Sequence, residues 1–326
     1  MLVEDKRMDL WKLRLSMVGT LGIIIGLSTL FFTVILSLMS SFSFITLGIL
    51  VVAFNIFQWL ISPYIIDAVY HVREIPVHEN PKLHETVENL SRKSGIKKPR
   101  LMLARIPIPN AFAYGSPIAG NRVAVTTGLL KSLEYEEVEA VLGHEFGHLK
   151  HRDVQIMMFV SILPSLLYFI GYSLMLSSMF GRQRNEGGGT VLLGIVFMVF
   201  SWVLNMFILY LSRLREYYAD RHSALIVDDG SRKLSEGLAK IVRSSRNVRK
   251  TRKQAQKLNA FKALFIADPD CAQTDSMAIS YVVPSSDQKL VQDIMSRKMT
   301  MMDRIMEVFS THPNVVKRLK ALQKLN

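Results

Sequence analysis

The sequence has very little cysteine. Cys271 is the only cysteine among 326 residues, so the chain cannot form an intrachain disulfide. This excludes the small secreted domains that depend on several disulfides, and it agrees with soluble parts that lie in a reducing compartment.

Charged residues are absent from four long stretches. These cover residues 17–39, about 42–66, about 154–180 and about 190–211, in a chain of which 49% is hydrophobic. Each is close to the roughly 20 residues that a helix needs to cross the hydrocarbon core of a bilayer. The sequence therefore predicts an integral membrane protein with about four transmembrane helices and excludes a purely soluble one.

The first uncharged stretch has an alternative interpretation as a cleaved signal peptide, because a short basic region precedes it. The apolar run is too long for that, and no small-residue cleavage site lies before the second stretch begins. We therefore expect residues 17–66 to form a retained pair of transmembrane helices.

The charge balance predicts the orientation in the membrane. Lys and Arg total 40 against 27 acidic residues, a formal net charge of +13. Residues 1–16 are basic, whereas the link between the first two stretches, around Ser40, carries no charge, so the N-terminus is expected in the cytosol. Each pair of spans returns the chain to the same side. Residues 67–153 and 213–326, which flank a hydrophobic hairpin at 154–212, should therefore both face the cytosol from the cell membrane.

Local patterns predict the elements of the soluble part. Helical spacing runs from Pro81 to Ser94, with Asn80 as the cap and Gly95 at the end. Residues 100–127 hold three β-like runs separated by Pro and Gly, which predict a small, largely antiparallel sheet. Helical spacing resumes at about Tyr135 behind several early glutamates, which suit the positive end of a helix dipole.

This last helix carries the sequence His144-Glu145-Phe146-Gly147-His148. Histidines four residues apart project from one helix face, one turn apart, so both can bind a single zinc ion. Glu145 lies beside such a metal, where it can take a proton from a bound water and pass it to a leaving amine. The alternative is a solvated helix with chance histidines, which the apolar flanks and the neighbouring membrane segment disfavour.

A catalytic zinc site of this type needs a third protein ligand and one open position. Glu216 is the best candidate, because it follows the hydrophobic hairpin that begins just after His148. Crossing and returning brings both ends of that hairpin to the same membrane face. Asp220 lies one helical turn after Glu216 and could orient a ligand histidine through its second nitrogen. The alternative for Glu216 is an ordinary ion pair with a neighbouring arginine.

The motif, the hairpin and the later run Glu216-Tyr217-Tyr218-Ala219-Asp220 together resemble the HtpX-type membrane zinc metallopeptidases, which are related to the CAAX prenyl proteases. The resemblance implies that Glu216 binds zinc and that Asp220 supports a ligand. It also implies that Asn110, Ala111, Phe112 and Ala113 form an edge strand that pairs with the substrate backbone. The alternative for these four residues is a buried strand.

Near the C-terminus, Thr311-His312-Pro313 and then Arg318 resemble a late element of the same family, whose histidine and arginine lie near the zinc. Both residues are then expected to stabilise developing negative charge. From the residues alone, His312 has the alternative of a helix cap before Pro313.

The predicted fold is mostly α: four transmembrane helices and a cytosolic α+β zincin-like catalytic domain. The resemblance implies an endopeptidase with one zinc ion per chain, acting on membrane or misfolded proteins in quality control or the stress response. The alternatives are a processing protease for lipidated peptides and a catalytically inactive membrane scaffold. The two histidines and one glutamate favour zinc but tolerate cobalt or manganese.

Residues 232–257 hold ten Lys or Arg and one acidic residue, Glu236. We interpret this stretch as a solvated helix face or loop, with contact to anionic lipid headgroups as the alternative. Nucleic acid is not an expected partner, because no aromatic stacking residues are interleaved with the basic ones.

Overall fold

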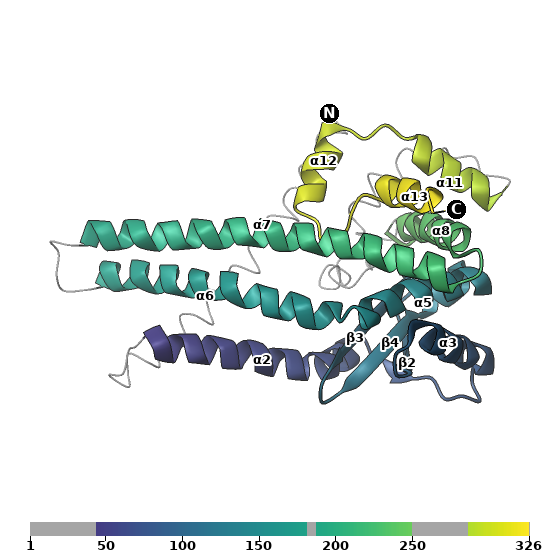
Figure 1. Cartoon of the computed structure of the whole chain (residues 1–326), viewed down its shortest axis with the longest axis horizontal. Helices are drawn as coiled ribbons and strands as arrows, with labels where there is room; N and C mark the ends of the chain where they lie inside the picture. Colours follow the sequence, from purple (N-terminus) through teal and green to yellow (C-terminus); the bar gives the residue numbers. More distant parts are fainter. Residues whose placement is uncertain (1–43, 181–186, 250–285, 326) are drawn as a thin grey trace. The chain divides into compact units, whose positions relative to one another are not determined.

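The computed structural model describes residues 44–180, 187–249 and 286–325 (Figure 1). The expected basic N-terminus and first transmembrane helix, Cys271, and residues 250–257 of the basic stretch lie outside these ranges. The helices are α2 (Phe44–Val69), α3 (Pro81–Ser94), α4 (Thr127–Ser132), α5 (Tyr135–Lys150), α6 (Asp153–Phe180), α7 (Gly187–Ile226), α8 (Gly230–Arg249), α11 (Asp287–Ser296), α12 (Met301–Val308) and α13 (Val315–Gln323). The strands are β1 (Arg73–Glu74), β2 (Arg100–Ala104), β3 (Ala111–Ser116) and β4 (Gly120–Thr126).

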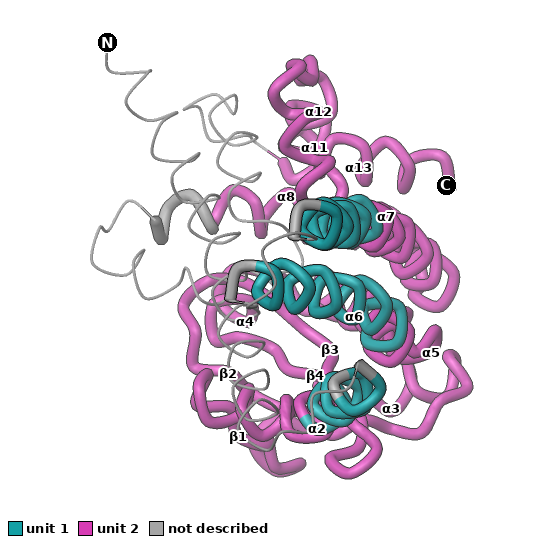
Figure 2. The backbone as a smooth tube through the Cα atoms, turned by 90° about the vertical axis from the view of Figure 1, so that its left-hand side faces the viewer, with its two compact units in different colours: residues 1–57, 158–205 teal, residues 58–157, 206–326 magenta. Residues whose placement is uncertain are grey.

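The chain divides into two compact units (Figure 2). Unit 1 comprises residues 1–57 and 158–205, and unit 2 comprises residues 58–157 and 206–326. Helices α2, α6 and α7 each continue from one unit into the other. All of the sequence features with predicted chemistry belong to unit 2.

Three described helices are long and apolar enough to cross a membrane: Gly48–Val69, Asp153–Ser178 and Gly189–Ile226. They coincide with three of the four uncharged stretches in the sequence. Helix α7 has 40 residues, about twice the length that a bilayer requires. Its second half therefore extends beyond the apolar stretch and carries Glu216 and Asp220, on a helix continuous with the membrane segment as expected.

Within unit 1, the described helices contact one another through small and apolar side chains. Val51 and Phe169 form a buried pair between α2 and α6. Ser201 of α7 donates a hydrogen bond to the carbonyl oxygen of Pro164 in α6, at 2.7 Å. Most large apolar side chains of α7 in this unit, such as Leu192 and Trp202, are exposed, as expected of helices that face lipid.

The sheet of unit 2 has the strand order β1-β2-β4-β3. β1 pairs with β2 and β3 with β4 in antiparallel fashion, but β2 and β4 are parallel, so the sheet is mixed rather than purely antiparallel. The reason lies in residues 105–110, which carry the chain past the position of β4 before β3 begins. β4 then returns between β2 and β3 and leaves β3 at the edge of the sheet.

Side chains alternate between the two faces of this sheet. On one face, Leu101, Val123 and Val125 join the main core, to which α3, α5, α8, α11 and α13 contribute. On the other, Met102 and Ala124 pack with a second cluster that includes Phe112, Tyr114 and Tyr70. This period of two confirms the three predicted strands, whereas the two-residue strand β1 had no recognisable sequence signal.

The caps predicted for α3 are present, and α5 begins with a cap of its own. The Asn80 side chain accepts a hydrogen bond from the Leu83 amide at 3.1 Å, and Gly95 ends α3 in the left-handed conformation, with φ of 68°. At the start of α5, the Glu137 carboxylate accepts from the Glu134 amide at 2.7 Å. These contacts fix where the helix with the two histidines begins.

The described part of the basic stretch is helix α8, which packs against α5 and α11. Lys240 pairs with Glu137 at 2.7 Å and with Asp287 at 2.9 Å, and Arg232 pairs with Glu236 at 2.8 Å. These basic residues therefore make structural ion pairs within unit 2, which agrees with a helix whose charges serve the fold.

Candidate metal centre

The site is formed where α5 and α7 pack closely against each other. A Cβ atom on Gly147 of α5 would lie 2.8 Å from the Cα atom of Ala219 of α7, so only glycine allows this approach. The Ser223 hydroxyl of α7 donates to the Ala140 carbonyl of α5 at 2.6 Å. The close packing brings the carboxylate of Glu216 to the histidine face of α5.

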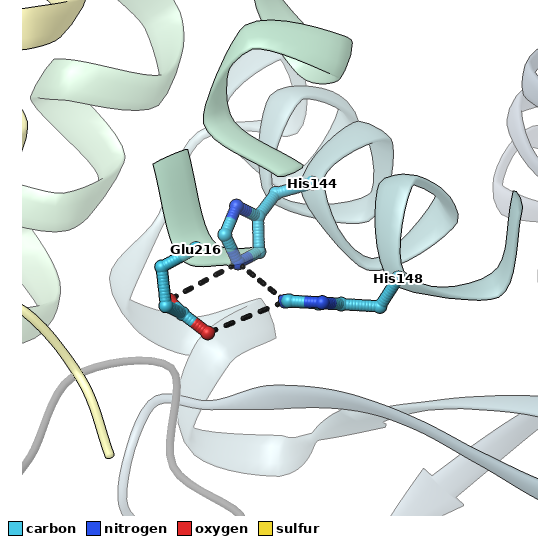
Figure 3. Close-up of side chains that lie close together, drawn as sticks. All are labelled: His144, His148 and Glu216. Carbon is cyan, nitrogen blue, oxygen red and sulfur yellow. Dashed lines mark hydrogen bonds and ion pairs between the residues drawn. The ribbon is translucent and has the colours of Figure 1, made fainter. Parts of the chain in front are cut away.

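His144, His148 and Glu216 direct their polar atoms at one another (Figure 3). The Nε2 atoms of the two histidines are 3.1 Å apart. Oε2 of Glu216 is 3.6 Å from Nε2 of His144, and its Oε1 is 3.4 Å from Nε2 of His148. Among the described residues, this is the one group of three His, Cys, Asp or Glu side chains arranged to hold a metal ion.

Each histidine is held by a carboxylate at its other ring nitrogen. Nδ1 of His144 lies 2.9 Å from Oδ1 of Asp220, the residue that the sequence suggested for this position. Nδ1 of His148 lies 2.6 Å from Oδ2 of Asp153, which in turn pairs with Arg215. Asp153 was not among the predicted site residues, although it lies only five residues after His148, at the start of α6.

The residues fit a divalent metal ion. Tetrahedral zinc with bonds of about 2.0–2.2 Å keeps its ligand atoms roughly 3.3–3.6 Å apart, close to the distances between the three side chains. The site also favours positive charge: burial lowers the pKa of His148, but the bonds to Asp153 and Glu216 outweigh it and raise that pKa to about 10. A cation bound at the Nε2 atoms would take the place of that proton.

Arg318 of α13 lies behind the ligand carboxylates. It donates two hydrogen bonds to Asp220, at 2.9 and 2.6 Å, and its Nη1 is 3.0 Å from Oε2 of Glu216. The side chain is fully buried. Burial lowers the pKa of Arg318, but Asp220 and Glu216 outweigh this effect and the net shift is upward. Arg318 therefore contacts both predicted carboxylates at once.

His312 lies in the loop before α13. Its Nδ1 is 3.2 Å from Oε1 of Glu216, so the structure brings it to the same cluster as the three predicted ligands. The alternative of a helix cap is wrong, because Asn314 caps α13 by accepting a hydrogen bond from the Val316 amide at 2.9 Å.

Glu145 faces the edge strand of the sheet. Its Oε2 accepts a hydrogen bond from the backbone amide of Ala113 in β3, at 2.8 Å. Burial raises the pKa of Glu145, although the charges of His148 and His144 oppose the shift. The amide of Ala113 therefore points out of the sheet and into the site.

The other residues of the predicted substrate strand are arranged differently. Asn110 precedes β3, and its backbone N–H donates to Oγ1 of Thr126 at 2.9 Å. Ala111 is part of the main core, and the Phe112 ring packs with Tyr70 and Tyr114 on the sheet face away from that core. Their side chains are buried, so only the backbone of this strand is available to a partner at the edge.

The chain matches known proteins over most of its length. The model of peptidase family M48 matches residues 77–326. The protease HtpX homolog of Thermoplasma acidophilum is 38% identical over 277 residues, covering 83% of this chain and 82% of that protein. The homolog of Thermoplasma volcanium is 35% identical over 319 residues, covering 96% and 95%.

The crystal structure of S. mikatae Ste24p shares the fold, with a TM-score of 0.55 and 17% identity over 97% of this chain and 67% of that one. The HtpX-type resemblance of the sequence is confirmed by the family model and the relatives. The apolar helices agree with a membrane location for such a protein. The chain therefore belongs to peptidase family M48 and is a membrane metalloprotease.

Proposed function

We propose that this protein is a zinc-dependent endopeptidase that cleaves membrane or misfolded proteins at the cytosolic face of the cell membrane. His144, His148 and Glu216 hold the metal, and Glu145 is the general base. The observation that carries the proposal is the convergence of two histidine nitrogens and one carboxylate, 3.1–3.6 Å apart, beside a buried glutamate.

The ligand set of two histidines and one glutamate is that of catalytic zinc sites, which keep a position open for water or substrate. When bound, zinc activates that water and polarises the peptide carbonyl. Asp220 and Asp153 accept the Nδ1 protons of His144 and His148, which directs both Nε2 atoms toward the position of the metal, where the cation would replace any proton they carry. One zinc ion per chain is expected.

Glu145 moves the proton. Its carboxylate takes the proton at Oε from the attacking water and delivers it to the leaving amine. A base works best when its pKa lies near the working pH, and burial shifts the pKa of Glu145 upward from the usual glutamate range. The hydrogen bond from the Ala113 amide fixes the direction in which this carboxylate points.

His312 and Arg318 have different parts in this proposal. The His312 side chain is partly exposed and lies beside Glu216, and in this role it would donate a hydrogen bond to a developing oxyanion. Arg318 is fully buried against Asp220 and Glu216, so it acts by holding these two carboxylates in position. The positive charge of Arg318 would also stabilise negative charge that develops on a nearby oxyanion.

The substrate pairs with β3. Because β3 lies at the edge of the sheet, an extended polypeptide can add to it as a further strand. The edge begins near Asn110 and passes Ala113, whose amide already faces Glu145. Backbone pairing of this kind selects for extended, unfolded chains rather than for one particular sequence, which fits a role in protein quality control.

The test compares the wild type with Glu145→Gln, both purified in detergent. Bound metal is determined by elemental analysis, and cleavage is followed on an unfolded protein such as casein and on a prenylated peptide. We expect one zinc ion per chain in both proteins and casein cleavage by the wild type alone, with removal of zinc by a chelator abolishing it.

Wild-type protein without bound metal would contradict the proposed site. Stoichiometric zinc with cleavage of only the prenylated peptide would favour the processing protease. Zinc without cleavage of either substrate would favour the inactive scaffold.

A further inference from the structure

Helix α12 exposes a stripe of large apolar side chains. Those of Met301, Met302, Ile305, Val308 and Phe309, the last directly after the helix, are between 44% and 79% exposed. The spacing of one, three or four residues places them along one side of a helix. Single exposed apolar residues are ordinary, but a continuous stripe of them marks a surface that contacts a membrane or another protein.

The charges of α12 are distributed unevenly. Asp303 is buried and pairs with Arg297 at 3.1 Å, and Glu307 is buried and pairs with Lys317 at 2.5 Å. Arg304 is therefore the one exposed charged residue of this helix. An apolar face beside a basic side chain, with the acidic groups turned inward, is the pattern of a helix that lies on an anionic lipid surface.

Helix α12 is fixed to α7 at the place where α7 leaves its uncharged stretch. Arg213, the first charged residue after that stretch, donates to the carbonyl oxygens of Glu307, Val308 and Ser310 at 2.9, 3.0 and 2.8 Å. The exposed Tyr210 ring lies 5.7 Å from the same guanidinium. Tyr and Arg are typical of the level at which a helix passes from hydrocarbon to water, so α12 is held at that level.

The direction of α12 also fits a lipid surface. Within unit 2, α12 runs across the direction of α7 rather than along it (Figures 1 and 2). A helix that crosses a membrane-spanning helix in this way lies in the plane of the membrane surface, which is how amphipathic helices bind to bilayers.

The turn between β3 and β4 is a second exposed apolar element near the level at which the helices pass from hydrocarbon to water. Pro117 and Ile118 form the exposed turn between β3 and β4, and Ile118 is 68% exposed. The preceding Ser116 donates from its hydroxyl to the Leu60 carbonyl at 3.1 Å. Leu60 lies within the candidate span Gly48–Val69, roughly 13 Å along the helix from its end at Val69.

The hairpin of β3 and β4 contacts α2 at more than one position along that helix. Tyr114 donates to Oδ1 of Asp67 at 2.7 Å, and Arg122 pairs with the same carboxylate. Asp67 lies nearer the end of α2 than Leu60 does, so the turn points along α2 into its apolar part. The most exposed residue of the turn, Ile118, is therefore directed toward lipid.

We propose that the stripe of α12 and the turn at Pro117 and Ile118 form one membrane-contact surface. They enter the headgroup layer of the bilayer that α2, α6 and α7 cross, with Arg304 against anionic lipid. The surface adds two places of contact with lipid to those that the transmembrane helices make. It does not depend on the chemistry of the metal site.

The test uses the full chain in nanodiscs of phosphatidylcholine with phosphatidylglycerol. With Cys271→Ser as background, single cysteines at Ile305→Cys, Ile118→Cys and the control Gln292→Cys, on the exposed face of α11, are labelled with an environment-sensitive fluorophore. We expect lipids spin-labelled near the headgroup to quench the first two labels and iodide to quench the control. Adding Arg304→Gln should reduce the extra quenching at Ile305→Cys in anionic over neutral nanodiscs.

Quenching of the Ile305→Cys label by iodide to the same extent as the control would overturn the proposal. A label shielded from both quenchers would also overturn it, because another part of the chain or a second copy would then cover α12. Gel filtration reports whether each variant is folded, and Phe309→Cys replaces Ile305→Cys if that variant aggregates.

Discussion

Unit 2 contains two clusters of charged side chains that resemble each other in composition and differ in what they can do. In the α8 cluster, formed by Lys240, Glu137 and Asp287, each carboxylate meets the ammonium group at 2.7–2.9 Å. In the metal cluster, formed by His144, His148, Glu216, Asp220 and Arg318, two histidine nitrogens and a carboxylate oxygen face a common point. Ion pairs that satisfy each other stabilise a fold, whereas convergent acceptors create a place for a cation.

The two clusters also obtain their geometry in different ways. The α8 cluster joins three helices through one flexible lysine, so small shifts of a helix are absorbed by the side chain. The metal cluster depends on the close approach of α5 and α7 at Gly147 and on carboxylates that fix both histidine rings. Rigid support is what a preorganised site requires, and it makes the second cluster more sensitive to substitution.

The largest effect is expected for Arg318→Ala. Removing one partner of a buried ion pair costs about 3–5 kcal/mol, and here Asp220 and Glu216 both lose their cation. Chemical denaturation should show this loss in the free energy of unfolding. Arg318→Lys should recover part of it, and an unchanged unfolding free energy in Arg318→Ala would contradict the buried pairing.

The next effect is expected for Gly147→Ala. The new methyl group meets the backbone of Ala219 at 2.8 Å, so α5 and α7 must separate, at a cost of about 1–3 kcal/mol. Bound zinc should fall because Glu216 moves away from the histidines. Gly237→Ala is the matched control: its methyl group finds ordinary contacts at 3.4–3.6 Å, and that variant should keep its metal.

A smaller effect is expected for Asp153→Asn. This carboxylate orients His148 but does not itself face the metal, and loss of such support lowers metal affinity about 10–100-fold. Competition with a fluorescent chelator measures the change. Equal zinc affinity in the variant and the wild type would show that His148 keeps its orientation without Asp153.

The smallest effect is expected for Lys240→Met, which breaks the α8 cluster and should leave zinc content unchanged. Burial raises the pKa of Glu137, while Lys240 opposes that shift. Without Lys240, the pKa of Glu137 in the folded protein rises further above its value in the unfolded chain than it does in the wild type. The variant should thus lose about 1 kcal/mol at neutral pH and less under acidic conditions, where Glu137 is protonated in both states.

Thermal unfolding measured at several pH values tests this prediction. A loss of zinc from Lys240→Met would mean that the two clusters are coupled rather than separate. A stability loss that grows as the pH falls would contradict the assignment to Glu137.

Local patterns predicted the elements that depend on nearby residues. Asn80 and Gly95 mark both ends of α3 correctly, and the alternation in β2 and β4 follows the two faces of the sheet. The spacing of His144 and His148 predicted that they would face one point, because the helix period alone determines it. Glu216 was selected by its place after the hydrophobic hairpin and one helical turn before Asp220, and the even number of predicted membrane crossings put it on the same membrane face as His148.

Features that depend on the path of the chain could not be predicted in this way. The parallel pairing of β2 with β4 depends on the crossover at residues 105–110, which has no local signal. Asp153 reaches His148 because the chain turns sharply at Arg152, where φ is 55°. The contact of Arg318 with Asp220 joins residues 98 positions apart, and only the packing of α13 against the core brings them together.

The edge strand β3 has a consequence for where a substrate is cut. It runs from the turn at Pro117, beside the apolar part of α2, to Ala113, whose amide faces Glu145. Ser116 lies three positions after Ala113, roughly 10 Å along an extended chain. In a polypeptide paired along this strand, the cleaved bond would lie at a fixed distance from the lipid surface. The length of β3 between the turn and Ala113 would set that distance.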